Sequence, residues 1–545
     1  MTSPSPSASP ARPVPHFHNA NIALNLREAA QMYPSRPAIR LDDTVLSYAE
    51  LDELSARAAG WLRERGLVPG DPVGLMLPNI PHFPVFYYGV LRAGGSVVPM
   101  NPLLKEREVA HYLGDSGARL ILAAEGAAGE AAAGAQRSGA TAVTISGPML
   151  ADVAGWPLAP EIAPRADDDT AVILYTSGTT GTPKGAELTH SNMHRNALVS
   201  ATSLFGLGPD DVVMGCLPLF HSFGQTCGLN AAVLSGSCLT LIPRFSPAAA
   251  LQVIERDRVT VFEGVPTMYV GLLAEAEARS NAGKAEARSD EAEAEARSNA
   301  GDAPVPDTGS LRLCVSGGAA LPVEVLRGFE RALGAVILEG YGLSETSPVA
   351  TFNLKEQRRP GSIGVPIEGV ELRLVDADGN VVTQPGEIGE IAIRGHNVMK
   401  GYWGRPEATS QAIRDGWFHT GDLARADADG FYYIVDRKKD MIIRGGYNVY
   451  PREIEEVLYE HPAVLEAAVI GVPHAALGEE VGAAVTLCPG AKTTPGELRE
   501  YVRERVAAYK YPRHVWLTDG LPKGPTGKVL KREIVIPADV TEQAR

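Results

Sequence analysis

The sequence predicts an α/β protein with a large N-terminal body and a smaller α+β unit at its C-terminal end. Between residues 21 and 366, short continuous apolar runs alternate with helical patterns. Continuous apolar strands separated by helices are typical of sheets that are buried on both faces. The clearest of these runs are AVILY at 171–175, LRLCV at 311–315 and AVILE at 335–339.

After residue 369 the pattern changes to short strands separated by tight turns. In ELRLVDADGNVV, the Asp378-Gly379 pair predicts a hairpin turn. The last hundred residues predict a compact mixed unit, in which a helix begins with Pro451 at its first position. The other elements expected in this unit are strands at 464–472 and 481–487 and a helix at 495–506.

Length, charge and cysteine content exclude several classes of protein. The chain has 545 residues, which exceeds one ordinary domain, and 45% of them are hydrophobic, which fits a large core. A net charge of −15 argues against nucleic-acid or anionic-membrane binding, because phosphates require a basic face. The five cysteines show neither zinc spacing nor a disulfide framework. No apolar run could span a bilayer, and the N-terminus lacks the apolar core of a secretory signal.

These features predict a cytoplasmic protein whose partners are small molecules and not nucleic acids. They leave weak membrane association open, as well as the choice between a monomer and a homodimer. Residues 1–15 are expected to be a disordered Ser/Pro-rich tail, residues 16–436 the N-terminal domain, and residues 437–545 a C-terminal lid domain. An insertion at 274–307 contains a nine-residue motif written three times at 276–302, with no apolar stripe. We expect it to be a solvated insertion; partner docking is the alternative.

The strongest chemical motif is YTSGTTGTPKGAELTHSN at residues 175–192. It follows an apolar strand and precedes a helix that Thr189 or Ser191 is expected to cap. Hydroxyl side chains and glycines ahead of Lys184 form a loop of N–H and O–H donors, which suits triphosphate oxygens. The loop is not a Walker A motif, because Pro183 stands where that motif has glycine. A flexible linker is the alternative, but a linker rarely joins a buried strand to a helix and carries a lysine.

This loop resembles the signature of the adenylate-forming superfamily, which includes acyl-CoA synthetases, luciferases and the adenylation domains of peptide synthetases. The resemblance extends over residues 21–533 and points to the fatty-acid–CoA ligase branch. It implies a body of two sheets sandwiched by helices, a small β-rich subdomain and a mobile lid. It also implies ATP, Mg²⁺ and coenzyme A as cofactors and co-substrates. The residues that it places around the ATP phosphates are Thr176, Ser177, Gly178, Thr179, Thr180, Gly181, Thr182 and Lys184.

Two further motifs follow predicted strands. SGGAALP at 316–322 has glycines that let a flat ring approach the backbone, and GYGLSETSPV at 340–349 combines a ring, a carboxylate and a hydroxyl. The resemblance implies that Glu345 binds Mg²⁺, since a carboxylate repels phosphates unless a hard cation lies between them. Taken alone, Glu345 would be a surface acid. The resemblance also implies an α-phosphate contact for Thr346, adenine stacking for Tyr341, and nucleotide contacts for Gly317, Gly318, Ala319, Glu339, Gly340 and Gly342.

Two motifs nearer the C-terminus supply charged side chains. WFHTGDLA at 417–424 contains Asp422, whose two oxygens match the two hydroxyls of a ribose. The resemblance makes Arg437 a second ribose contact; an interdomain salt bridge between the two is the alternative, and both roles are compatible. In PKGPTGKVLKRE, Gly527 helps to bend the chain so that Lys528 reaches a distant site. By resemblance, Lys528 is the adenylation lysine that bridges the acid and the α-phosphate.

The second half of the reaction is implied by the segment RGGYNVYPREIE. In the family, Gly445 and Gly446 border a tunnel for the pantetheine arm of coenzyme A after the lid has rotated, and two glycines let a slender thiol chain pass. Asn448 belongs to the same expected site, and Lys439 is the position about which the lid swivels. A simple turn between a strand and a helix is the alternative for the two glycines.

The acid-binding pocket is expected at LPLFHSFGQT, residues 217–226, where His221 and Phe223 line the carboxylate site by resemblance. Peptide synthetases place an aspartate nearby to hold an amino group, and no acid occurs here between residues 216 and 241. Small residues and VPTMY at 265–269 indicate a deep apolar slot. We expect a medium- or long-chain fatty acid, with an aryl acid such as a cinnamate as the alternative. The expected pocket residues are His221, Phe223, Gly224, Val265, Gly317, Gly342 and Ser347.

The expected reaction has two steps: ATP adenylates the acid with release of pyrophosphate, and CoA then takes the acyl group with release of AMP. A fatty-acyl-AMP ligase that loads a carrier protein is an alternative, although its extra insertion is missing from the short stretch 350–364. A luciferase-type oxygenase is another, and an inactive scaffold is disfavoured because the expected charged residues are present. The expected catalytic residues are Lys528, Lys184, Thr346, Glu345 and His221.

Overall fold

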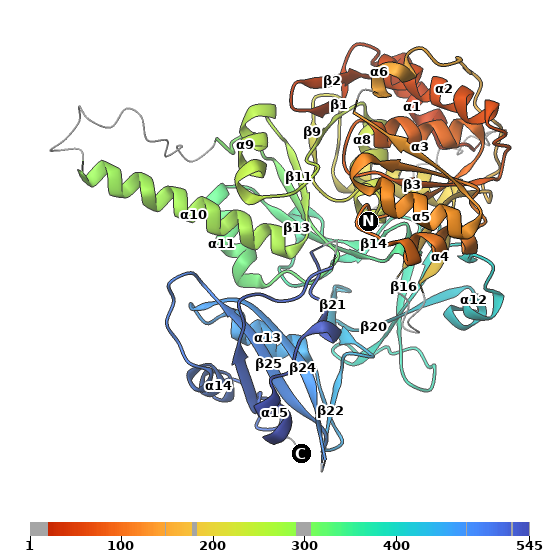
Figure 1. Cartoon of the computed structure of the whole chain (residues 1–545). Helices are drawn as coiled ribbons and strands as arrows, with labels where there is room; N and C mark the ends of the chain where they lie inside the picture. The colour runs from red at the N-terminus through yellow and green to blue at the C-terminus, as the bar shows by residue number, and fades with distance from the viewer. Residues whose placement is uncertain are drawn as a thin grey trace, which may run out of the picture.

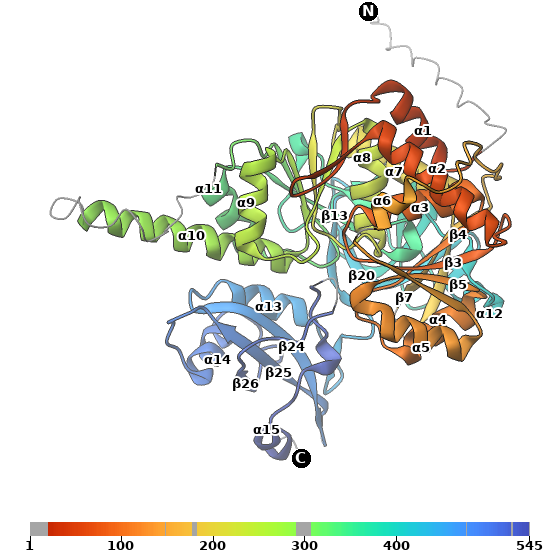
Figure 2. The same cartoon turned by 45° about the horizontal axis from the view of Figure 1, so that its top comes forward.

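The computed structural model describes residues 20–147, 149–176, 183–289, 307–475, 477–524 and 527–543. Within these residues the strands form four sheets, three in the N-terminal body and one in a small C-terminal unit. Figure 1 shows the body in red to cyan and the small unit in blue beneath it. Helix α10 (Pro266–Ser289) projects away from the body in both views (Figures 1 and 2). The predicted α/β fold class is confirmed.

A seven-stranded sheet carries the phosphate-loop motif near one edge. Strands β7 and β8 form an antiparallel hairpin in which Thr176 pairs with Lys184. Helices α4 (Glu106–Ser116) and α5 (Ala128–Ser138) pack on this sheet through small apolar residues. The strands, in spatial order, are β18 (Gly401–Tyr402), β8 (Lys184–Thr189), β7 (Thr170–Thr176), β4 (Ser96–Pro99), β3 (Pro72–Met76), β5 (Leu120–Ala124) and β6 (Thr141–Ile145).

A nine-stranded sheet carries the nucleotide and acid motifs. Its central strands β11, β12 and β13 are parallel, so the motifs that follow them gather at one edge, where ligands bind in open α/β sheets. The strands, in spatial order, are β15 (Val365–Pro366), β14 (Val349–Phe352), β13 (Ile337–Gly342), β12 (Leu313–Ser316), β11 (Val261–Gly264), β9 (Val212–Gly215), β10 (Cys238–Leu241), β1 (Pro37–Leu41) and β2 (Thr44–Ser47).

Helices fill the space around these two sheets. Helix α3 (His82–Ala93) is buried on all sides, as expected for a helix that is apolar all round. Helix α7 (His190–Val199) begins after Thr189, whose Oγ1 accepts the N–H of Asn192 at 3.1 Å, so the predicted cap is confirmed. The remaining helices of the body are α1 (Ala23–Met32), α2 (Tyr48–Glu64), α6 (Met149–Val153), α8 (Ala231–Ser235), α9 (Pro247–Asp257), α11 (Val323–Leu333) and α12 (Pro406–Ala412).

The third sheet of the body is small, and its strands pair antiparallel. The predicted turn at Asp378-Gly379 forms, with φ +88° at Gly379, but the strands beside it meet only in an isolated Val375–Val381 bridge. Strand β16 pairs instead with β17, which lies farther along the chain. The strands are β16 (Val370–Val375), β17 (Ile388–Gly395), β20 (Trp417–Ala426), β19 (Ile413–Arg414) and β21 (Tyr432–Arg437).

The C-terminal unit has one five-stranded sheet covered by helices. Helix α13 (Pro451–Tyr459) has proline at its first position, as predicted, and buries Ile454 and Leu458. Its other elements are β22 (Ile442–Arg444), β23 (Tyr447–Val449), β24 (Val464–His474), β25 (Gly478–Leu487), β26 (His514–Leu517), α14 (Pro495–Arg503) and α15 (Ala538–Gln543). All five cysteines are free. In the part of the chain that the structure describes, no helix is long and apolar enough to traverse a lipid bilayer.

Candidate active site

The β7–β8 hairpin brings together three of the predicted residues. Thr176 and Lys184 face each other across the hairpin, and the Oγ1 of Thr176 donates to Glu345 at 3.4 Å. The Tyr402 hydroxyl donates to the same Glu345 oxygen at 3.0 Å, and the Lys184 Nζ lies 5.2 Å from the centre of the Tyr402 ring. Glu345 is half-buried, and its desolvation raises its pKa. A nearby cation would offset that cost and favour the charged carboxylate.

The residues around Glu345 fit a magnesium ion that arrives with a nucleotide. Within the described ranges, no group of three or more His, Cys, Asp or Glu side chains could hold a metal on its own. Mg²⁺ is commonly bound by one or two carboxylates together with substrate phosphates and water, and Glu345 provides such a carboxylate beside Lys184. The loop residues expected around the phosphates, Ser177, Gly178, Thr179, Thr180, Gly181 and Thr182, lie outside the residues that the structure describes.

Asp422 and Arg437 lie opposite each other on strands β20 and β21. The Arg437 Nε is 3.2 Å from Asp422 Oδ1, and the Tyr341 hydroxyl donates to Asp422 Oδ2 at 2.7 Å. The salt bridge considered as an alternative is therefore present. It is compatible with ribose binding, because each carboxylate oxygen can accept a second hydrogen bond. Tyr341, expected at the adenine, is thus held beside the expected ribose site.

At the glycines of the two nucleotide motifs, atoms of other residues lie close to the position that a Cβ would occupy. Gly318 has φ +78° and is exposed together with Ala319, and a Cβ on Gly318 would lie 3.4 Å from Val265. At Gly342, a Cβ would lie 1.8 Å from the Pro348 carbonyl oxygen. A side chain at that position is impossible without moving the turn that carries Glu345. Gly340 is similarly confined by Phe352, at 2.8 Å.

The hydroxyl groups of Thr346 and Ser347, which were expected to contact the substrates, are hydrogen-bonded to main-chain atoms. The Thr346 Oγ1 donates to the Pro348 carbonyl at 2.6 Å and accepts the N–H of Leu343 at 2.8 Å. The Ser347 Oγ donates to the Asn397 carbonyl at 2.9 Å, and both side chains are fully buried. These bonds hold the turn around Glu345, so an α-phosphate contact for Thr346 and a pocket contact for Ser347 stay predictions.

Lys528 reaches the body from the C-terminal unit. The N–H of Gly524 donates to the Lys528 carbonyl at 2.8 Å, which closes the turn, and the Thr267 hydroxyl donates to the Gly527 carbonyl at 3.3 Å. Burial, followed by the nearby Arg437 charge, lowers the pKa of Lys528 to about 8. Burial and the charge of Lys528 lower the pKa of His221 to about 4. The Lys528 charge therefore acts on His221 and is itself influenced by Arg437 and Asp422.

The expected acid pocket adjoins this lysine. Phe223 is buried, and a Cβ on Gly317 would meet its ring at 3.0 Å. Val265 lies between Gly318 of the body and Gly527 of the C-terminal unit, at 3.4 Å and 3.2 Å from the Cβ positions of these glycines. Gly224 begins a buried π-helical segment, and a Cβ there would be 2.5 Å from the Pro218 carbonyl oxygen. The acid segment and the nucleotide glycines thus meet at Lys528.

Other predicted residues lie apart from this centre. Lys439 is exposed in the connection between β21 and β22, where the chain passes from the third sheet of the body into the small unit. Gly445, Gly446 and Asn448 lie at the exposed β22–β23 turn, in the small unit beneath the body in Figure 1. The structure does not bring this turn to Lys528.

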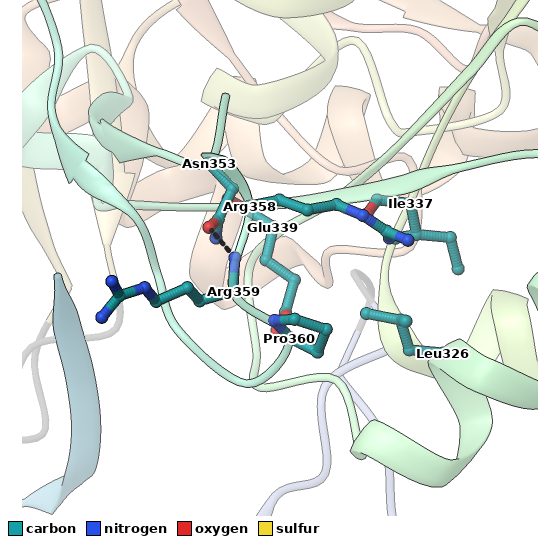
Figure 3. Close-up of a pocket in the computed structure, with 7 residues that line it drawn as sticks. All are labelled: Leu326, Ile337, Glu339, Asn353, Arg358, Arg359 and Pro360. Atoms are coloured by element: carbon teal, nitrogen blue, oxygen red, sulfur yellow. Dashed lines mark hydrogen bonds between the residues drawn. The ribbon is translucent and has the colours of Figure 1, made fainter. Parts of the chain in front are cut away.

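Glu339 is directed toward a recess under the loop that follows β14 (Figure 3). Its carboxylate accepts the N–H of Gly361 at 2.8 Å, and Pro360 lies against it. Burial raises the pKa of Glu339 to about 7. Its side chain is therefore bonded to the loop, and a nucleotide contact for Glu339 stays a prediction.

Sequence reasoning missed Tyr402 and Glu263. Tyr402 supports both Glu345 and Lys184, yet it lies on the two-residue strand β18, whose pairing with β8 gives no local sequence signal. Glu263 lies on β11 within an apolar run. An acidic residue in an otherwise apolar strand was the signal in the sequence that could have identified it.

Together, the Glu345 carboxylate beside the β7–β8 hairpin, the Asp422–Arg437 pair at the expected ribose site and Lys528 on the C-terminal unit match the arrangement expected of an ATP-using, acid-activating enzyme. The AMP-binding enzyme family model matches residues 26–403, and the AMP-binding enzyme C-terminal domain model matches residues 453–528. The chain belongs to the AMP-binding enzyme family, and the predicted resemblance to the adenylate-forming superfamily is confirmed.

Similar proteins cover nearly the whole chain. A long-chain-fatty-acid–CoA ligase of Bacillus subtilis (strain 168) is 36% identical, over 96% of this chain and 96% of the ligase. A feruloyl-CoA synthase of an Amycolatopsis species is 39% identical, over 93% and 96%. The crystal structure of ATP-bound MatB from Rhodopseudomonas palustris has a TM-score of 0.83 at 34% identity, and covers 94% of this chain and 98% of that one. The chain is thus an AMP-forming acid–thiol ligase that uses ATP and coenzyme A, with Mg²⁺ typical of its family.

Proposed function

We propose that this ligase activates a medium- or long-chain fatty acid as its acyl-AMP and transfers the acyl group to coenzyme A. The observation that carries the proposal is the position of Lys528. Its loop extends from the C-terminal unit to Thr267 and Val265 of the body, and its charge interacts with His221, on the acid segment, and with Asp422 and Arg437. An acid carboxylate and an α-phosphate are both negative, so a cation between them lowers the cost of their approach.

In the first step, the acid carboxylate attacks the α-phosphorus of ATP, the bond to the bridging oxygen breaks, and pyrophosphate leaves. Lys528 neutralises the two anions where they meet, while Asp422 and Arg437 hold the ribose in place. Lys184, in cation–π contact with Tyr402, neutralises the departing phosphates. Bound through Glu345, Mg²⁺ supplies further charge neutralisation to the triphosphate. Catalysis here consists of positioning and electrostatics, and no residue forms a covalent intermediate.

In the second step, the CoA thiolate attacks the acyl carbonyl of acyl-AMP, and AMP leaves. We propose that the chain divides between residues 436 and 437, with the preceding domain starting at residue 16, and that the lid turns about Lys439. This rotation removes Lys528 and brings Gly445, Gly446 and Asn448 to the site. Support comes from the exposed position of these residues and from the single connection between β21 and β22.

The buried, uncharged acid segment supports a fatty acid as substrate. Between Phe223 and Ala232 the chain is buried, and no charged side chain occurs there. The B. subtilis relative is called a long-chain-fatty-acid–CoA ligase. An aryl acid is the second candidate, because the feruloyl-CoA synthase is slightly more identical to this chain.

The experiment is a substrate panel measured in two assays. Acid-dependent exchange between ATP and pyrophosphate reports the first step, and CoA-dependent release of AMP reports the second. Saturated acids of six to sixteen carbons and cinnamic and benzoic acids form the panel. We expect both activities with the fatty acids. Exchange without AMP release would indicate a carrier-protein acceptor, and activity with aryl acids alone would overturn the fatty-acid assignment.

A further inference from the structure

Glu263 is a buried acidic side chain that the proposed reaction does not use. It lies near the end of β11, is 1% exposed, and its Oε1 has no hydrogen-bond partner within the described residues. The Cys216 thiol donates to the main-chain carbonyl of Glu263 at 3.3 Å, and when ionised the Glu263 carboxylate raises the pKa values of Cys216, Cys227 and Tyr269. Buried polar groups are nearly always paired, so the unpaired Oε1 of Glu263 suggests that a ligand supplies its partner.

The position of Glu263 relates it to the acid segment. A Cβ on Gly228 would lie 3.5 Å from Glu263 Oε2, and Gly228 belongs to the same π-helical segment that follows Phe223. Glu263 also precedes Val265 by two residues, a spacing of about 7 Å in an extended chain. Since Val265 contacts the loop that carries Lys528, Glu263 lies farther from the reacting carboxylate and deeper along the same wall.

The chemical state of Glu263 follows from its surroundings. Burial raises its pKa to about 8, and no cation offsets this shift. At pH 7 the side chain is therefore mostly a neutral carboxylic acid, with one O–H donor and one free carbonyl acceptor. This pair of groups matches an alcohol or phenol, which also donates once and accepts. A methylene chain offers neither and leaves the carboxyl unpaired.

We propose that Glu263 hydrogen-bonds an uncharged hydroxyl group that the acid substrate carries several bonds from its carboxylate, and thereby selects hydroxylated acids over their hydrocarbon analogues. This inference rests on the proposed acid–CoA ligase function and narrows its substrate class. Two kinds of acid carry such a hydroxyl: a hydroxylated fatty chain and a phenolic aryl acid. The chemistry of recognition is the same for both.

Two matched pairs of acids test the proposal: 10-hydroxydecanoate with decanoate, and 4-hydroxycinnamate with cinnamate. The measured quantity is kcat/KM for CoA-dependent AMP release, expressed as the ratio of hydroxylated to unhydroxylated acid within each pair. We expect the wild-type ratio to reach at least about tenfold in one pair, because sites that pair with a substrate hydroxyl strongly reject analogues without it. The pair that shows the preference identifies the fatty or the aryl source.

Variants assign this preference to Glu263. Glu263→Leu should bring the ratio to about one, whereas Glu263→Gln, which still donates and accepts, should keep most of it. Glu263→Met provides a second apolar variant of similar length in case the leucine variant melts below the assay temperature. Cys314→Ala is the matched control, because Cys314 is buried on the neighbouring strand and alternates to the opposite sheet face. It should keep the wild-type ratio.

Turnover with ratios near one in both pairs would overturn the inference and leave the ligase function standing. A ratio that survives Glu263→Leu or Glu263→Met, or one that Cys314→Ala reduces equally, would also overturn it. In those cases Glu263 is a buried side chain that takes no part in selecting the substrate. Absence of AMP release with every acid would overturn the ligase proposal itself, and with it this inference.

Discussion

Burial gives two basic side chains beside the reaction site unusual charge states. The pKa of Lys528 is lowered to about 8, and that of His221 to about 4. At pH 7 Lys528 is therefore mostly protonated and His221 is neutral, so of these two side chains the lysine would supply the positive charge to an acid bound in the proposed pocket. His221 can orient the carboxylate through a hydrogen bond but adds no charge.

This difference predicts how adenylation depends on pH. Because the protonated lysine is the active form, kcat/KM for ATP–pyrophosphate exchange should fall about tenfold per pH unit once the pH exceeds about 8. Lys528→Arg should lower the rate but remove this decline, since arginine stays charged. Exchange that stays constant to pH 9.5 in the wild type would contradict the role of Lys528. A similar decline in CoA transfer from supplied acyl-AMP would do so as well.

At the scale of elements, the site is built where strands end. The β7–β8 hairpin presents Thr176 and Lys184, and the turn after β13 presents Glu345. Gly342 fixes that turn, since a Cβ there would lie 1.8 Å from the Pro348 carbonyl oxygen. Rigid strands and turns therefore set the spacing of the charged groups, which suits electrostatic catalysis that depends on position.

The β22–β23 turn allows a prediction for the second step. Nothing lies within 4 Å of a Cβ placed on Gly446, so a larger side chain there would meet no neighbour in the present lid orientation; its φ of +86° adds some strain. Gly446→Trp should therefore slow CoA-dependent AMP release by at least about tenfold and change ATP–pyrophosphate exchange much less. Gly490→Trp, at another exposed glycine of the lid with positive φ, is the control. Equal effects of Gly446→Trp on both steps would contradict a tunnel at this turn.

Several elements of the fold were predictable because the sequence encodes them locally. The apolar run at 171–175 became β7 (Thr170–Thr176), and Thr189 caps α7 as predicted. The partner of β16 was not predictable, because pairing with β17 is decided by packing beyond the Asp378-Gly379 turn. Contacts between distant segments, such as Tyr402 with Glu345, likewise depend on the assembled sheet.

At the scale of the whole molecule, the proposed reaction uses groups from both the body and the C-terminal unit. Hydrogen bonds join the lid to the body. The Thr267 hydroxyl of the body donates to the Gly527 carbonyl of the lid, and the main-chain N–H of Arg452 in the lid donates to Asp436 at 3.1 Å. Lys528 and Gly446 lie on separate parts of the lid, and only Lys528 reaches the site in this orientation. A single connection near Lys439 joins the body to the C-terminal unit, as the proposed rotation of the lid requires.

Separate measurement of the two half-reactions in Lys528→Ala tests the central claim most directly. The account predicts that acid-dependent ATP–pyrophosphate exchange falls by about 10²–10³, as expected for loss of one preorganised charge. CoA transfer from supplied acyl-AMP should stay close to the wild-type rate. Lys523→Ala, which removes a lysine of the same turn that pairs with Glu466 of the lid, should alter neither step appreciably. Equal loss of both half-reactions in Lys528→Ala, or full retention of exchange, would contradict the account.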